Sequence, residues 1–273
     1  MKIRKNNPIL DRLKVIFVLL VLLVVLGNLV QYIENKGSSK KESNIELLLQ
    51  MALEPVGSTM YVWGGGWDDE DKEAGATSTH IGLDPQWENF RKQQDETYDH
   101  NTHRWERQNG LDCSGYVGWV IYNIFESKDG EEGYVTTSTD MAKNYADRGW
   151  GVYMEHPTEV LPGDIVSMEG HVWISLGTCA DGSVLLAHSS PPGVSVCGTL
   201  LADGTESMAV KLATEYMTEY HPEWQAMYPN RSVSHSYLEN ISLMRWNSTT
   251  MMDAKEFQAL CAEKVLVRIL KVE

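Results

Sequence analysis

Three side chains in this sequence are of the types that a cysteine hydrolase uses: a nucleophile, a base and an orienting group. Cys113 stands in the segment LDCSG, and His171 and His188 follow later in the chain. A thiol attacks a carbonyl carbon once an imidazole takes its proton, and a third group holds that imidazole in place. A cysteine alone is more often a small buried hydrophobe, so the histidines carry the functional interpretation.

The thiol is expected at the start of a helix. Helical spacing relates Cys113, Val117, Val120, Ile121 and Ile124, which predicts a helix from about Cys113 to Phe125. The free N–H groups and partial positive charge of a helix N-terminus lower a thiol pKa and can hold an oxyanion. Asp112 and Ser114 suit the tight turn that enters this helix.

The two histidines are expected on one β-hairpin. Residues 171–176 and 183–188 have strand character and are joined by GTCADG, a turn-forming segment. Side chains alternate across a strand, so His171 shares a face with Trp173, and His188 shares a face with Leu186. Pairing of the strands would bring both imidazoles to the same side.

The rest of the chain predicts an α+β layout, in which helices precede antiparallel strands. Further helices are expected near 44–54, 139–147, 206–219 and 252–264, and strands at 160–168 and 241–246. A polar segment without sustained periodicity, 67–110, reads as an insertion or functional loop.

Six segments, in this order, resemble the motifs of the NlpC-type cell-wall peptidases, which have a papain-like core. They are YVWGG (61–65), LDCSGYVGWV (111–120), TSTDMAKNYADRGWGV (137–152), LPGDIV (161–166), GHVWISLG (170–177) and LLAHSS (185–190). The resemblance covers about residues 45–200.

The resemblance implies a function and roles for individual residues. It makes Cys113 the nucleophile, His171 the general base and acid, and His188 the orienting group. It implies a central antiparallel sheet with the nucleophile helix packed on it, and neither a metal nor a cofactor. Family members hydrolyse amide bonds in peptidoglycan stem peptides, typically from γ-D-glutamate to a diamino acid. The residues expected to bind substrate around the thiol are Tyr61, Asp112 and Ser114.

This chain departs from the family pattern in three places. Residues 66–110 intervene before the nucleophile, the histidines are further apart than usual, and a long extension follows about residue 200. Loops shape substrate clefts, so the bond that is cut stays open. An amidase or acyltransferase with the same triad, or a catalytically silent wall-binding or assembly subunit, are the alternatives. The insertion contains three tryptophans, Trp67, Trp87 and Trp105. They either stack on sugar or anchor the loop, and we favour the second.

The N-terminal segment predicts a membrane anchor. Residues 15–26 read VIFVLLVLLVVL, and five basic residues precede them. An apolar helix over 15–33 is about long enough to span a bilayer. Basic residues mark the cytoplasmic side, and no A-x-A cleavage pattern follows. We therefore expect a cytoplasmic stub (1–14), a single-pass signal anchor (15–33), a linker (34–44) and a peptidase domain (45–273) outside a bacterial cell.

Charge and cysteine content exclude other classes of protein. The 273 residues carry a net charge of −15, which argues against nucleic acid as a partner. Expected partners are stem peptides and the membrane, and the question of a protein partner stays open. Four cysteines are too few for a disulfide scaffold, although Cys179 and Cys197 flank the second histidine strand and a bond between them stays open. Neither the acidic run 68–71 nor the pair His100 and His103 has the spacing of a metal site.

Overall fold

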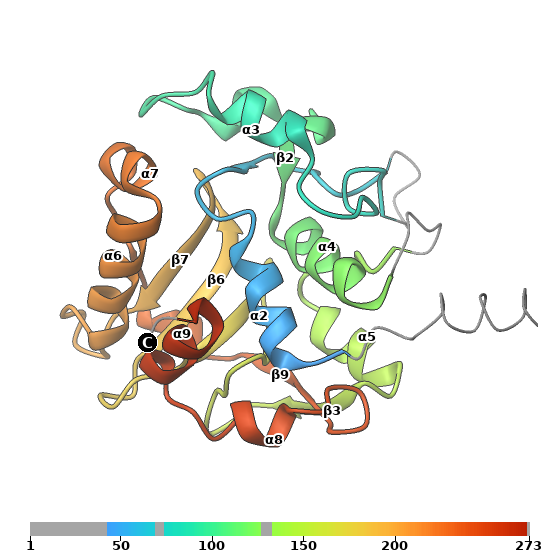
Figure 1. Ribbon diagram of the computed structural model, residues 1–273, viewed down its shortest axis with the longest axis vertical. Coiled ribbons are helices and arrows are strands. Elements are labelled where there is room, and N and C mark those ends of the chain that lie inside the picture. The colour runs from blue at the N-terminus through green and yellow to red at the C-terminus, as the bar shows by residue number, and fades with distance from the viewer. Residues whose placement is uncertain (1–42, 69–73, 127–132, 272–273) are drawn as a thin grey trace, which may run out of the picture. The chain divides into compact units, whose positions relative to one another are not determined.

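A curled mixed β-sheet with helices packed against it forms the α+β fold of this chain (Figure 1). The computed structural model describes residues 43–68, 74–126 and 133–271. The expected cytoplasmic stub, the membrane anchor and nearly all of the linker lie outside these residues. Within the described ranges, no helix combines the length and apolar character needed to cross a membrane.

The strands of the sheet run in the order β2-β1-β7-β6-β5-β4-β9-β3, and β8 pairs with β7. Most neighbours are antiparallel, but β1 with β2 and β7 with β8 are parallel, so the implied antiparallel sheet is mixed in this chain. The strands are β1 (Met60–Tyr61), β2 (Gly110–Leu111), β3 (Gly151–Glu155), β4 (Ile165–Met168), β5 (His171–Thr178), β6 (Val184–Ser190), β7 (Gly193–Thr199), β8 (Ser232–Val233) and β9 (Ser242–Trp246).

Most of the expected helices are confirmed. The helices are α2 (Ile45–Leu53), α3 (Pro85–Arg91), α4 (Cys113–Phe125), α5 (Met141–Asp147), α6 (Met208–Tyr220), α7 (Pro222–Met227), α8 (Ala254–Phe257) and α9 (Ala262–Leu270), with short 3₁₀ turns η1 (His100–His103), η2 (Arg107–Asn109) and η3 (His235–Leu238). The prediction of a single helix near 252–264 is wrong, because two helices, α8 and α9, occupy this region. Cys261 takes an extended backbone conformation and caps a separate helix, α9.

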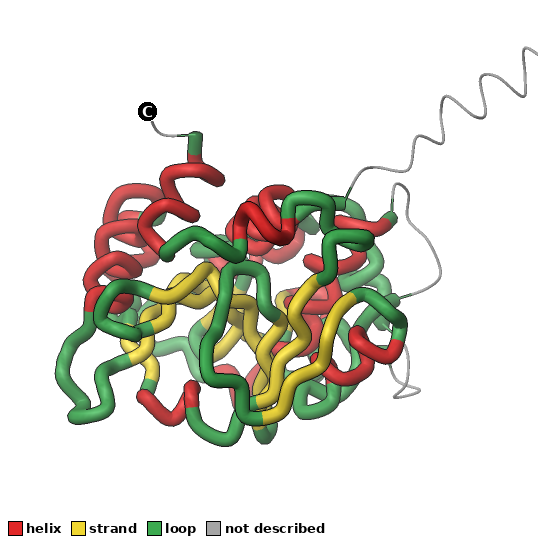
Figure 2. The backbone as a smooth tube through the Cα atoms, turned by 90° about the horizontal axis from the view of Figure 1, so that it is seen from below, coloured by secondary structure: helices red, strands yellow, loops and turns green. Residues whose placement is uncertain are grey.

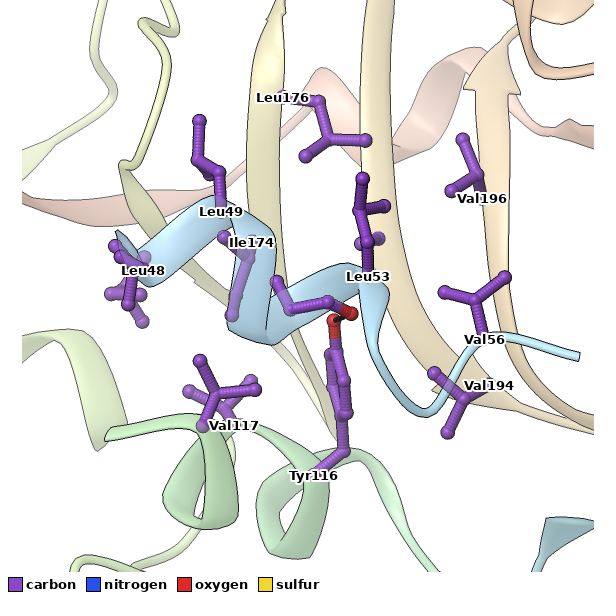
Figure 3. Close-up of a cluster of buried hydrophobic side chains, with 14 of the residues drawn as sticks. Leu48, Leu49, Leu53, Val56, Tyr116, Val117, Ile174, Leu176, Val194 and Val196 are labelled. Atoms are coloured by element: carbon purple, nitrogen blue, oxygen red, sulfur yellow. Dashed lines mark hydrogen bonds between the residues drawn. The ribbon is translucent and has the colours of Figure 1, made fainter. Parts of the chain in front are cut away.

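The larger core lies between the sheet and the helices on one of its faces. Figure 3 shows leucines of α2 against apolar side chains of α4, β5 and β7. The Tyr116 hydroxyl donates a 2.7 Å hydrogen bond to the Ala52 carbonyl, which joins α4 to α2. The side chain of Asn44 caps α2 by accepting from the Leu47 N–H, as Asn does at many helix starts. Helix α4 is therefore held on the sheet by packing along almost its whole length.

A smaller core lies on the opposite face of the hairpin. Its members are Val160, Val166, Trp173, Val184, Leu186, Cys197, Ile241 and Leu243. No α-helix of the described residues supplies a side chain to it. Val233, Tyr237 and Leu238 of the C-terminal extension pack against it instead, and Figure 2 shows most helices gathered on the other side of the strands. The disulfide that the sequence left open between Cys179 and Cys197 does not form: both cysteines are free, and Cys179 belongs to the larger core whereas Cys197 belongs to the smaller one.

The insertion leaves the sheet and returns to it at neighbouring positions. Strand β1 precedes it and β2 follows it, and the two pair in parallel, with Met60 opposite Gly110. Inside it, Asp84 caps α3 and Pro85 occupies the first turn. This Asp-Pro pair is a helix-start signal that the polar composition of the segment hides. Trp87 is buried edge-to-face against Trp119 of α4, so this tryptophan anchors the insertion.

A buried ion pair joins the Pro-Gly-Asp turn before β4 to strand β9. Asp164 is fully buried, and its carboxylate accepts from the Arg245 guanidinium at 2.8 and 3.1 Å and from the Leu161 N–H at 2.8 Å. The same guanidinium also contacts the exposed Glu159. A buried carboxylate needs such partners because removing it from water is costly.

We predict that Arg245→Met lowers the free energy of unfolding by about 3–5 kcal/mol, since it leaves the Asp164 carboxylate buried without its cation. Urea denaturation measures the change. Glu159→Gln removes only the exposed partner of the same arginine and should cost less than about 1 kcal/mol. Equal stability of Arg245→Met and the wild type would contradict this account.

Candidate active site

The start of α4 is organised by one buried carboxylate. Asp112 is the N-cap, and its Oδ1 accepts hydrogen bonds from the Gly115 N–H at 2.7 Å and the Ser114 hydroxyl at 2.9 Å. Its Oδ2 accepts from the Gly64 N–H at 3.2 Å. Asp112 also lines the cleft, but these bonds occupy both oxygens. The residue was expected to bind substrate, whereas its contacts are those of a residue that holds the site together.

Ser114 is held in the same network. Its hydroxyl donates to Asp112 and accepts from the indole N–H of Trp67 at 2.9 Å. Trp67 comes from the beginning of the insertion, so the insertion is fastened to the first turn of α4. Gly66 makes this approach possible: its φ is +95°, and a side chain there would lie 2.5 Å from the Gly115 Cα.

Strand β6 is tied to the residue that precedes the Asp112 cap. The Ser189 hydroxyl donates a buried 2.7 Å hydrogen bond to the Leu111 carbonyl. Ser189 follows His188, and Leu111 lies two residues before Cys113. One short bond therefore sets the distance between the histidine strand and the thiol helix.

The structure brings the two predicted histidines together. His171 at the start of β5 and His188 on β6 are joined by a hydrogen bond of 3.0 Å between Nε2 and Nδ1, and both rings lie on the face predicted from strand alternation. Burial lowers the pKa of His171 to about 4. Burial, His171 and the Arg231 guanidinium lower the pKa of His188 well below its usual range. Both imidazoles are therefore neutral at pH 7, the form a general base needs.

The thiol lies beside the first residues of β5. Cys113 is 7% exposed, and the backbone N–H groups of Val172 and Ser114 favour its ionised form. Burial, together with the Asp112 carboxylate, nevertheless raises the pKa of the thiol to about 12. The lowering expected from the helix N-terminus is thus wrong for the substrate-free protein, because desolvation outweighs the helix-end effect. Within the described residues no hydrogen bond joins the thiol to His171, so the pair rests as neutral thiol and neutral imidazole.

Tyr61 stands near the thiol, as the family motif implies. Its pKa is raised by burial and by the nearby Cys113 and Asp112. The insertion braces it from behind: the Tyr98 hydroxyl donates to the Tyr61 carbonyl at 2.7 Å, and His100 meets the Tyr61 ring edge-on at 5.5 Å. Sequence reasoning assigned Tyr61 to the site but not the residues that hold it.

An open cleft of about 430 Å³ leads to Cys113. Besides Cys113 it is lined by Tyr61, Trp63, Gly64, Trp67, Trp105, Asp112, Ser114, Thr137, Ser138, Thr139 and Gly170. All three residues expected around the thiol are among them. Two of the three tryptophans in the insertion also line this cleft, whereas the anchoring one, Trp87, does not.

Trp63 and Trp105 form an exposed aromatic rim of this cleft, with 43% and 50% of their surfaces accessible. Trp105 has a φ of +67°, a conformation that costs a non-glycine residue about 1–2 kcal/mol. Its N–H donates to the Trp63 carbonyl at 2.8 Å. The Arg104 guanidinium lies over the Trp63 ring, 4.7 Å from its centroid. Sequence reasoning did not single out Trp63 as a site residue, although it lies inside the YVWGG motif.

No protein-family model matches this chain, and no curated protein or solved structure is significantly similar to it.

We predict that Cys113 in the substrate-free protein reacts slowly with iodoacetamide at pH 7. A thiol pKa near 12 leaves at least about tenfold less thiolate than an ordinary cysteine has. Peptide mass spectrometry compares Cys113 with the more exposed Cys261 in the same sample. The Cys113 rate should keep rising above pH 9, whereas faster labelling of Cys113 than of Cys261 at pH 6–7 would reveal a preformed thiolate and contradict the prediction.

Proposed function

We propose that this protein is a cysteine peptidase of the NlpC type that hydrolyses amide bonds in peptidoglycan stem peptides, of the γ-D-glutamyl-diamino acid kind. In this proposal the domain is papain-like and is held outside a bacterial cell by the anchor at 15–33. The observation that supports it is the hydrogen bond between His171 and His188. The residue after His171 is Val172, and its backbone N–H contacts the Cys113 thiol.

The proposed reaction begins with both partners neutral. The Cys113 sulfur attacks the amide carbon while His171 takes the thiol proton, and a C–S bond forms as the carbonyl oxygen gains charge. Backbone N–H groups at the start of α4 stabilise that oxyanion. His171 then gives its proton to the leaving amine, and the C–N bond breaks. Water, activated by His171, hydrolyses the thioester and regenerates the thiol.

In this scheme His188 keeps the base in position. Its Nδ1 accepts from the Nε2–H of His171, which leaves the other ring nitrogen of His171 free to take a proton. A neutral His188 is required for this, and burial beside the Arg231 guanidinium favours the neutral form. When His171 becomes protonated, the same bond to His188 stabilises the imidazolium.

The shape of the insertion favours an enzyme over a catalytically silent subunit. The described part of the insertion, 66–68 and 74–110, leaves Cys113 on the lining of an open cleft. It supplies Trp67 and Trp105 to the walls of that cleft and braces Tyr61 through Tyr98. Side chains held in this way are suited to contact a substrate.

We predict that Cys113→Ala abolishes the release of fragments from purified peptidoglycan while the domain stays folded. Cys261→Ala is the matched control, because it removes a thiol far along the chain at the cap of α9, and it should digest like the wild type. Mass analysis of the products identifies the bond: a cut within the stem supports the proposal. Release of whole stems would indicate an amidase, and a transfer product would indicate an acyltransferase. Either result would overturn the proposal, and so would unchanged digestion by Cys113→Ala.

We also predict that Trp105→Ala raises the KM for peptidoglycan fragments roughly tenfold with little change in kcat, since an exposed aromatic wall contributes binding of about 1.4 kcal/mol. Trp105→Phe keeps an aromatic ring and should recover most of the affinity. Steady-state kinetics on a soluble muropeptide measure both parameters. An unchanged KM for Trp105→Ala would show that this rim does not contact substrate.

A further inference from the structure

One aromatic ring of the C-terminal extension lies against both histidines of the site. Tyr237 belongs to η3 and meets the His171 ring at 5.5 Å and 64°, and the His188 ring at 6.0 Å and 73°. The two histidine rings are themselves 5.2 Å apart at 76°. The three rings therefore pack edge-to-face as one group, the preferred geometry for aromatic contacts.

Tyr237 contacts both of the imidazole rings that share the hydrogen bond. Within the described ranges, no α-helix supplies a side chain to this face of the hairpin, and the residues of the C-terminal extension that pack against it are Val233, Tyr237 and Leu238. Only Tyr237 of these makes ring contacts with the histidines. Water reaching the pair would compete for Nε2 of His171 and Nδ1 of His188, and a hydrogen bond between buried groups is stronger when water is excluded.

We propose that Tyr237 is a positioning residue: its ring shields the His171–His188 hydrogen bond from water and keeps the two imidazoles in their catalytic orientation. This inference rests on the proposed function. Tyr237 acts through the histidines, and its aromatic ring, not its hydroxyl, excludes water from them. The C-terminal extension is on this view a part of the site, although it lies outside the region that resembles the family.

Three titratable or charged groups surround these rings: Arg231, Cys197 of β7 and Cys113. The Arg231 guanidinium lowers the pKa of His188 and opposes the rise in the pKa of Cys197. Cys197 and Cys113 both raise the pKa of Tyr237.

Removing the Tyr237 ring leaves each of these groups in place, but it also removes the ring contact with Trp173 and the hydrogen bond between the Tyr237 hydroxyl and Ser190. Tyr237→Phe loses that hydrogen bond and keeps the ring. A rise in the pKa of His171 in Tyr237→Ala but not in Tyr237→Phe therefore reports loss of shielding.

Three variants test the proposal. Tyr237→Phe keeps the ring and should stay within about threefold of wild-type kcat. Tyr237→Ala should lower kcat by roughly ten- to a hundredfold with KM little changed, since orientation and not binding is lost. Leu238→Ala is the matched control, because it opens the same small core without touching a histidine, and it should leave kcat near the wild-type value.

Nuclear magnetic resonance titration of ¹⁵N-labelled histidine gives a readout independent of activity. In Tyr237→Ala the pKa of His171 should rise from about 4 toward its ordinary value, while Leu238→Ala leaves it unchanged. The shift would support shielding even if Cys113→Ala showed that the protein is not a peptidase. An unshifted His171 in a folded Tyr237→Ala protein, or the same shift in Leu238→Ala, would overturn the proposal.

Discussion

The buried carboxylate of Asp112 is the interaction on which the rest of the site depends. It joins the first turn of α4 to the glycine loop after β1 through hydrogen bonds to Gly115, Ser114 and Gly64. Burial raises its pKa to about 6, and these hydrogen bonds oppose the rise. Without the cap, the first N–H groups of α4 would be buried without acceptors. The position of Cys113 therefore depends on the hydrogen bonds that its neighbour Asp112 accepts.

The sheet separates two environments that meet at the candidate site. Helix α4 and Cys113 belong to the larger core, whereas the histidine-bearing face of the hairpin belongs to the smaller one. The bond from Ser189 to Leu111 fastens the two together. Because both the thiol and the imidazoles are largely removed from water, each is held in its neutral form. In the reaction that we propose, proton transfer within the pair is then the step that activates the thiol.

The two segments that depart from the family pattern both contribute to this site. The insertion, which could have been a cover, instead lines the cleft and is fastened to Ser114 through Trp67. The extension after residue 200 places Tyr237 against the histidines. Neither addition disturbs the hairpin or α4. The insertion begins and ends next to paired strands. The 232–238 segment of the extension packs on the smaller core, and α6 and α9 pack in the larger one.

Local patterns in the sequence were enough to determine the bounds of α4 and the pairing of the histidine hairpin, since helical spacing and strand alternation involve residues close in the chain. The common face of His171 and His188 followed from that alternation. Other features depended on segments far apart in sequence: the break between α8 and α9, the separation of Cys179 from Cys197, and the contact of Tyr237 with the histidines. The direction of the Cys113 pKa shift was also decided by tertiary structure, because the helix end that lowers it is local, whereas the burial that raises it comes from the whole fold.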